Sequence, residues 1–310
     1  MLYLLRSLSL IFVLVLFYGL KKARVLPESA GLVVQKIVIN VTIPATIISS
    51  FGSYQKDGEL LLASGYFMIL LLICIGLAWL LFRSQGTAGC GFAMINSTGY
   101  NIGSLSLPVI QNFYGDYGVM VSCMADIGNA LMSNGGTYAL TNSVMRHKKG
   151  DSVGAFLKNL AIQLLKSPPF DCYILLAPLL VLNISIPSAV VTLLSPIANA
   201  GSFMSMAMVG LSMGTEMKWE DIRDIAPILL YRLCFGWITA AATYFLLPFS
   251  QTIREILTLL CLSPIVGLAV ISTQRYGGNT ERAGLTVSVS IVLGIVQLLI
   301  LSSIFQILHG

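Results

Sequence analysis

The stretch TAGCGFAMINSTGYNIGSLSLPVIQNFYG, residues 87–115, has the length of a transmembrane helix but not its usual composition. Its residues that loosen or interrupt a helix are Gly99, Gly103 and Pro108. Its polar side chains beside them are Asn96, Ser97, Thr98 and Asn101. Unwound backbone at membrane depth is tolerated only where protein or a water-filled cavity surrounds it. The stretch therefore predicts a broken helix inside a helical membrane protein; a proline kink used only for helix packing is the alternative.

The composition of the whole chain also indicates a membrane protein. Of its 310 residues, 56% are hydrophobic and 10% are charged, and its mean hydropathy is +0.86. A soluble domain carries about 25% charged residues. The apolar runs are about 20 residues long, which is the length that a helix needs to cross a bilayer, whereas a membrane barrel would show short alternating strands. We therefore expect an all-α integral membrane protein.

Polar breaks divide the chain into about ten apolar runs, in two groups of five. The first group comprises residues 2–20, 31–51, 60–82, 87–113 and 116–142. The second group comprises residues 169–186, 188–214, 225–248, 252–276 and 282–308. We therefore expect a first five-helix repeat over 1–142, a cytoplasmic linker over 143–167 and a second five-helix repeat over 168–310.

The basic residues are distributed unequally between the two sides that these spans define. Fourteen of the 18 lysines and arginines fall on one side, and only Arg6, Lys56 and Arg254 fall on the other. By the positive-inside rule the first side is cytoplasmic, which places both termini outside the plasma or inner membrane. The remaining basic residue, Arg232, lies about two turns into the eighth span and is expected to snorkel to the cytoplasmic surface. Because membrane topology accounts for the positions of the basic residues, the net charge of +5 does not indicate a nucleic-acid partner.

The expected linker contains apolar residues at helical spacing, with polar residues on its other faces. The apolar residues are Val153, Phe156, Leu157, Leu160, Ala161, Leu164 and Leu165. This pattern predicts a short amphipathic helix on the inner membrane surface, and a frayed linker segment is the alternative.

An odd number of spans in each half makes the second half enter the membrane in the opposite sense, so we expect inverted repeats. Pro44 interrupts the second span and Pro196 interrupts the seventh, its counterpart. The ninth span, LCLSPIVGLAVISTQRYGG at residues 260–278, is interrupted like the fourth. Its breaking residues are Ser263, Pro264 and Gly267. The fourth and ninth spans also end alike, at Tyr114-Gly115 and Tyr276-Gly277. Two interrupted helices at corresponding positions are the best sequence indication of a transport site.

The fifth span contains the most deeply placed acidic residue, Asp126, in VSCMADIGNALMSNGG at residues 121–136. A carboxylate at that depth costs several kcal/mol unless it is protonated, paired or bound to a cation. Asn129, Ser133 and Asn134 extend its polar helix face. We therefore expect Asp126 and Asn129 to serve in ion coupling, with H⁺ or Na⁺ as the ion. The alternative is a structural acid that is permanently protonated or hydrogen-bonded.

Two other patterns carry less weight. Residues 210–214, Gly-Leu-Ser-Met-Gly, have the GxSxG form of a serine nucleophile, but the histidines are His147 in the linker and His309 at the end. The glycine spacing is better interpreted as close helix packing. The six cysteines are scattered, and the methionines of residues 204–217 have no cysteine or histidine beside them. We therefore expect no metal site, no cofactor and no enzyme activity.

The sequence resembles the auxin efflux carrier family of membrane transporters, and within it the bacterial branch described as malate permease-like. The resemblance covers nearly the whole chain and rests on GLKKARVLPESAG (19–31), NVTIPATIISS (40–50), NSTGYNIGSLSLPVIQNFYG (96–115), ADIGN (125–129), KSPPF (166–170) and SPIVGLAVISTQRYGG (263–278). It implies crossed, broken fourth and ninth helices, similar to those of the bile-acid sodium symporter fold, with the site at the crossing. The site residues that it implies are Asn96, Ser97, Asn101, Ser263, Pro264 and Gln274, with Asp126 as a neighbouring charged contact.

These observations predict a secondary transporter that moves a small organic anion, such as a carboxylate or an auxin-like molecule, by alternating access. Because no lysine or arginine is expected beside either break, amide side chains and backbone N–H groups at the half-helix N-termini would hold the anion. Proton coupling, sodium coupling and uniport stay open. The alternatives are a sodium-coupled bile-acid-type symporter and a receptor or channel of the same fold. A homodimer is compatible with the sequence, whereas an ATP-driven pump is not, because GxxxxGK[ST] is absent.

Overall fold

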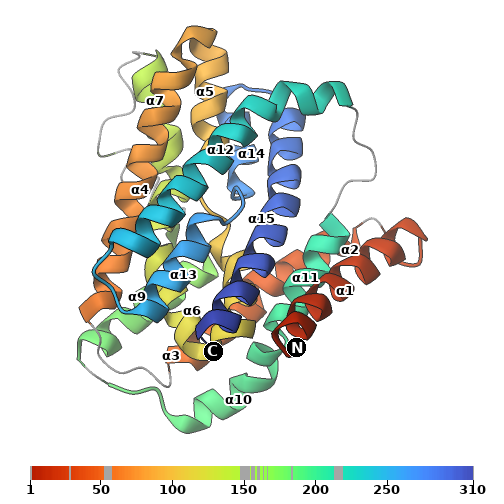
Figure 1. The fold of residues 1–310 in the computed structure, drawn as a ribbon, viewed down its shortest axis with the longest axis vertical. Helices are drawn as coiled ribbons and strands as arrows, with labels where there is room; N and C mark the ends of the chain where they lie inside the picture. Colours follow the sequence, from red (N-terminus) through yellow and green to blue (C-terminus); the bar gives the residue numbers. More distant parts are fainter. Residues whose placement is uncertain are drawn as a thin grey trace.

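The computed structural model describes residues 2–27, 29–51, 58–146, 154, 158, 161–162, 164–165, 167–182, 184–212 and 219–309 (Figure 1). Within these residues every regular element is a helix. The extended pairing that they contain is a single antiparallel bridge between Tyr100 and Ile265. The expectation of an all-α protein is therefore confirmed.

The helices follow one another along the chain with several short interruptions. Those of the first half are α1 (Leu2–Lys22), α2 (Ala30–Ile37), α3 (Ile43–Phe51), α4 (Gly58–Phe82), α5 (Gly86–Ser97), α6 (Leu107–Leu131) and α7 (Thr137–Arg146). Short π-helical segments precede or follow some of them, namely η1 (Val38–Thr42), η3 (Ile102–Ser106) and η4 (Met132–Gly136), and η2 (Arg83–Gln85) is a 3₁₀ turn. Those of the second half are α9 (Pro168–Val181), α10 (Ser188–Asn199), α11 (Gly201–Ser212), α12 (Trp219–Leu246), α13 (Gln251–Cys261), α14 (Leu268–Tyr276) and α15 (Thr280–His309).

Five stretches of the described chain are long and apolar enough to cross a membrane. They are Ala30–Phe51, Leu62–Ser97, Ser188–Ser212, Ile222–Leu246 and Thr280–Leu308. All five coincide with expected spans, and Leu62–Ser97 joins the third span to part of the fourth. The protein is therefore a helical membrane protein.

The helices pack in two groups (Figure 1). The peripheral group contains α1, α2, α3, α9, α10 and α11, in which α11 lies along α1 and α3 contacts both α9 and α10. The crossing group contains α4 to α7 and α12 to α15, and α6 lies at its centre with contacts to α3, α4, α11 and α13. Because α6 contacts helices of both groups, it forms much of the interface between them.

Both proline interruptions occur where the sequence predicts them. Pro44 has no N–H to offer to the carbonyl one turn earlier, and the chain widens just before it into the π-helical segment η1. Pro196 lies near the end of α10, and the helix ends three residues later at Asn199 before α11 begins at Gly201.

Glycines close the fourth and ninth spans, as their matching Tyr-Gly endings suggest. Gly115 has φ 59° and ψ −150° and kinks α6 sharply, so the fourth and fifth spans are joined without a separate loop. Gly277 has φ 80° in the left-handed region and ends α14. Both positions favour glycine because other residues rarely adopt positive φ.

Helix ends that are expected on the same side of the membrane contact each other. On the expected cytoplasmic side, polar contacts join Lys21 to Leu211 (2.8 Å), Tyr276 to Thr87 (2.8 Å) and Arg282 to Asp224. On the expected outer side, they join Ser50 to Asp116 (3.2 Å) and Tyr114 to Glu255 (3.0 Å). Each of these five contacts joins two residues that the expected spans place on the same side.

Gly210 packs closely against another helix, as the packing interpretation of residues 210–214 predicts, while residues 213 and 214 lie outside the described residues. A Cβ atom at Gly210 would lie 2.4 Å from the Leu14 carbonyl oxygen, so only glycine lets α11 approach α1 so closely. Ser212 of the same motif donates to the Met208 carbonyl of its own helix at 2.7 Å.

The predicted linker is only partly covered. Helix α7 continues to Arg146, four residues beyond the expected end of the fifth span. The predicted amphipathic helix of residues 153–165 lies mostly outside the described residues and stays a prediction.

Candidate functional site

The fourth span is broken between Ser97 and Ile102, as its sequence predicts. Thr98 is extended, with φ −107° and ψ 143°, and Gly99 has φ +96°. The chain resumes a helical path at Ile102. A Cβ atom at Gly99 would lie 2.8 Å from Val266 Cγ1, so glycine is needed here both for its backbone conformation and for close approach to the ninth span.

The ninth span is broken between Cys261 and Leu268, where α13 ends and α14 begins. The Tyr100–Ile265 bridge lies where the two breaks meet. The Asn101 N–H donates to the Pro264 carbonyl at 2.8 Å, and the Ser106 hydroxyl donates to Ser263 Oγ at 2.7 Å. The structure thus brings the two predicted breaks together, and with them Asn101, Ser263 and Pro264.

Asn129 on α6 holds the backbone of the first break. Its Oδ1 accepts the Tyr100 N–H at 2.8 Å and its Nδ2 donates to the Tyr100 carbonyl at 2.7 Å. Tyr100 is fully buried. Because Tyr100 lies where the helix is unwound, these two bonds replace those that a helix would supply.

Asp126, one turn before Asn129, is a buried carboxylate with two hydrogen-bond donors. Asn129 Nδ2 donates to its Oδ1 at 2.8 Å, and the Tyr173 hydroxyl on α9 donates to its Oδ2 at 3.0 Å. A Cβ atom at Gly103 would lie 3.7 Å from Oδ2, so the carboxylate faces the first turn of the helix that follows the break. The positive end of a helix dipole favours an anion there. Among the described residues, Asp126 forms no ion pair.

Asn96 and Ser97 lie at the end of α5 and are completely buried. Asn96 Nδ2 donates to Thr273 Oγ1 on α14 at 2.8 Å. Asn96 Oδ1 and Ser97 Oγ have no hydrogen-bond partner in the part of the chain that the structure describes. A buried polar atom without a partner costs about 1–3 kcal/mol, so the end of α5 offers unused hydrogen-bonding groups.

Gln274 is not part of the crossing in this structure. It is exposed on α14, while its neighbour Thr273 is buried and meets Asn96. Successive residues of a helix point about 100° apart, so only one of the two can face the interior. The predicted role of Gln274 in substrate binding stays a prediction.

Arg232 corrects two expectations. It does not snorkel to the surface but is 94% buried, since its exposed fraction is 6%. Its Nη2 donates to the Ser263 carbonyl at 3.0 Å, and its Cζ lies 3.9 Å from the centre of the Tyr100 ring. A basic residue therefore does lie beside the breaks. These two contacts hold the Arg232 side chain at the crossing, in the interior of the helix bundle, so it does not extend toward the membrane surface.

Sequence reasoning also missed three other side chains that complete the crossing. Tyr173 donates to Asp126, Thr273 accepts from Asn96, and the Ser290 hydroxyl accepts the Ile265 N–H at 3.1 Å. Tyrosine, threonine and serine are common in membrane helices, so these residues carry no signal of their own. The crossing could be predicted because the two halves of the chain have breaks at corresponding positions. The residues that support the crossing could not, because they follow only from the packing.

The fold and the crossing together define a class. The chain is a helical membrane protein whose interior contains two broken helices that meet at their breaks, an arrangement typical of secondary transporters. Residues 4–302 match the family described as "Membrane transport protein", so the chain belongs to that family. The match confirms the resemblance to the auxin efflux carriers.

One relative supports the same class. The chain is 23% identical over 297 residues to a protein of Methanothermobacter thermautotrophicus described as an "Uncharacterized transporter", and the similarity covers 94% of each chain.

Proposed function

We propose that this protein is a secondary active transporter that carries a small organic anion, such as a carboxylate or an auxin-like molecule, by alternating access. The observation that carries the proposal is the crossing of the two broken helices, with Tyr100 and Ile265 paired and polar atoms of Asn96 and Ser97 left without partners. The family match supports transport as the activity. The proposal places the substrate beside the crossing.

We further propose that the two halves are inverted repeats of five spans. Such repeats have a twofold axis in the membrane plane, so each contact between halves should have a counterpart. Helix α1 packs on α11, and its counterpart α9 packs on α3. Likewise, α2 packs on α11 and α10 packs on α3. These paired contacts support the repeat, as do the matched interruptions at Pro44 and Pro196.

Alternating access would move the crossing group against the peripheral group. Hydrogen bonds at their interface include that from Tyr173 on α9 to Asp126 on α6 and that from Ser202 on α11 to the Pro108 carbonyl on α6, at 3.0 Å and 2.7 Å. A change of conformation that slides α6 along its neighbours would have to break and remake these bonds. Of these two bonds, the one between Tyr173 and Asp126 has an acceptor that can be protonated, so its strength depends on the charge of Asp126.

Asp126 would then link ion binding to this motion. As a carboxylate it accepts a charge-assisted bond from Tyr173, which is about twice as strong as a bond between neutral groups. A proton on Asp126, or a Na⁺ ion beside it, would weaken that bond and release α6 from α9. Asn129 connects the same carboxylate to the backbone of the first break, so a change at Asp126 would also reach the crossing.

The proposed orientation has both termini outside the plasma or inner membrane. The charge pattern supports it, because the side that carries most lysines and arginines is the cytoplasmic side. The contacts between helix ends fit the same division into two sides.

The function is tested by reconstitution of the purified protein into proteoliposomes. Uptake of a panel of radiolabelled carboxylates, including malate and indole-3-acetate, is measured with and without imposed proton and Na⁺ gradients, against protein-free vesicles. We expect saturable uptake and counterflow of at least one carboxylate. Dependence on Na⁺ alone would identify a bile-acid-type symporter, and non-saturable flux would identify a channel. Carboxylate binding without uptake would indicate a receptor and refute the proposal.

A further inference from the structure

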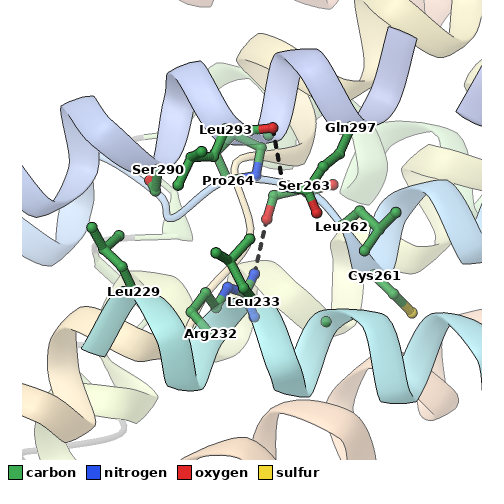
Figure 2. Close-up of a pocket in the computed structure, with 12 residues that line it drawn as sticks. Leu229, Arg232, Leu233, Cys261, Leu262, Ser263, Pro264, Ser290, Leu293 and Gln297 are labelled. Atoms are coloured by element: carbon green, nitrogen blue, oxygen red, sulfur yellow. Dashed lines mark hydrogen bonds between the residues drawn. The ribbon is translucent and has the colours of Figure 1, made fainter. Parts of the chain in front are cut away.

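A pocket lies between α12, the break of the ninth span and α15 (Figure 2). Its enclosed volume is about 20 Å³, which is room for one small group, and it is open on one side. Residues that line it include Arg232, Leu233, Ser263, Ser290, Leu293 and Gln297. It lies beside the crossing, because Ser263 belongs to the second break and Arg232 also covers the Tyr100 ring of the first.

Two polar side chains of the pocket have unused hydrogen-bonding capacity. Arg232 Nη2 donates to the Ser263 carbonyl, while the buried Nη1 of the same residue has no partner among the described residues. Gln297 donates from Nε2 to the Leu293 carbonyl at 3.0 Å, while its Oε1 is buried without a partner. Figure 2 shows both side chains directed toward Ser263 from the two helices that flank it.

The charge of Arg232 is only partly compensated. Within the described chain it forms no ion pair, although it is 94% buried. The Tyr100 ring face and the Ser263 carbonyl just beyond the end of α13 offset some of the cost of this buried charge. A buried cation is normally paired with an anion. Arg232 Nη1 has no such partner in the described chain, so an anionic ligand can bind to it.

We infer that this pocket binds the carboxylate of the transported anion, with Arg232 Nη1 as its charged donor. The inference rests on the proposed function, for which it supplies the group that recognises the substrate's charge. One carboxylate oxygen binds Nη1, since Nη2 is already bonded to Ser263. Gln297 Oε1 is an acceptor, so it can bind a hydroxyl or N–H group of the ligand but not the carboxylate. Because Arg232 contacts both breaks, an anion bound to it acts directly on the crossing.

The mode of binding predicts selectivity for charge. Indole-3-acetate and benzoate carry a carboxylate, whereas indole-3-acetamide and benzamide have nearly the same shape without the charge. Arg232 therefore discriminates between the members of each pair, and its replacement by glutamine removes the discrimination. The loss of one charge-assisted hydrogen bond weakens carboxylate binding by about tenfold to a hundredfold and leaves amide binding unchanged.

The experiment measures dissociation constants of the four compounds from the ligand dependence of the thermal midpoint of the purified protein. It compares wild type with Arg232→Gln. The matched control is Arg254→Gln, since Arg254 also donates to a backbone carbonyl, that of Tyr244, but lies outside the pocket. We expect the carboxylate preference in wild type and Arg254→Gln, and its loss in Arg232→Gln. A folded Arg232→Gln protein with unchanged preference would overturn the inference, as would absence of any carboxylate binding by wild type.

A second variant tests the inference in case the Arg232→Gln protein does not fold. Leu233→Trp fills the pocket and leaves Arg232 in place, so it should also abolish carboxylate binding. Binding constants that stay at the wild-type value in Leu233→Trp would contradict the inference. An arginine-dependent effect seen only after addition of anionic lipid would assign the pocket to a lipid headgroup and likewise overturn it. Binding that depends on Arg232 without any uptake in proteoliposomes would instead refute the transport proposal alone.

Discussion

The replacement Asn129→Ala tests how the broken fourth span is held. In the structure, Asn129 bonds the Tyr100 N–H and the Tyr100 carbonyl at 2.8 Å and 2.7 Å, and Tyr100 is completely buried. Alanine leaves both backbone groups without these partners. Each buried group that loses its partner costs about 1–3 kcal/mol, which gives about 2–6 kcal/mol in total.

The assay is the thermal midpoint of the detergent-solubilised protein, followed by size-exclusion chromatography after heating. With the unfolding entropy of a soluble chain of this length as a guide, the expected loss lowers the midpoint by roughly 3–9 °C. The matched control is Asn134→Ala, because Asn134 lies just over one turn further along and is partly buried, and among the described residues its amide donates to Ala130 of its own helix, at 2.8 Å. Its midpoint should fall by no more than about 1 °C. Equal midpoints for the two variants would refute the bridging role of Asn129.

Three further predictions concern coupling, motion and topology. Asp126→Asn keeps the size of the side chain and one of its two acceptor oxygens but cannot titrate, so uptake should lose its dependence on pH or Na⁺; a wild-type rate and dependence would make Asp126 a structural acid. Tyr173→Phe removes the donor to Asp126 between the two helix groups, so it should alter the maximal uptake rate while the substrate dissociation constant stays within about threefold; an unchanged rate would separate this bond from the transport cycle. In a cysteine-free background, Ser53→Cys should react with an impermeant thiol reagent in intact cells and Lys149→Cys only after permeabilisation, and the reverse pattern would invert the topology.

The breaks could be predicted because their chemistry is local. Gly99 and Pro264 interrupt a helix by their own backbone properties, and polar neighbours in an apolar run show that the interruption lies inside the protein. The prediction that the two breaks lie together needed one further assumption, that the two halves are inverted repeats. The helix face of Asp126 and Asn129 could be predicted in the same way, from spacing alone.

Other parts of the site depend on packing that the sequence does not encode locally. The partner of Asn129 is the backbone of Tyr100, and a backbone group carries no sequence signal. Whether Thr273 or Gln274 faces the interior depends on how α14 is rotated about its axis. Both residues are polar, so the sequence does not distinguish between them. Arg232 was expected to reach the surface because its position along the span allows it, whereas its actual partners, the Ser263 carbonyl and the Tyr100 ring, follow only from the packing.

Uptake kinetics of Asn101→Ala in proteoliposomes address most directly whether the crossing is the transport site. Asn101 bonds the second break through its backbone, and within the described part of the chain its partly buried side chain accepts from the nearby Ser104 hydroxyl. If the amide contacts the substrate, the half-saturation concentration of the transported carboxylate should rise about tenfold or more, with normal insertion and thermal midpoint. Asn40→Ala should behave like wild type, because the exposed Asn40 amide bonds the Lys36 carbonyl of the preceding turn in the structure that is described. Wild-type kinetics in a well-folded Asn101→Ala protein, or no saturable carboxylate uptake by wild type, would contradict a transport site at the crossing.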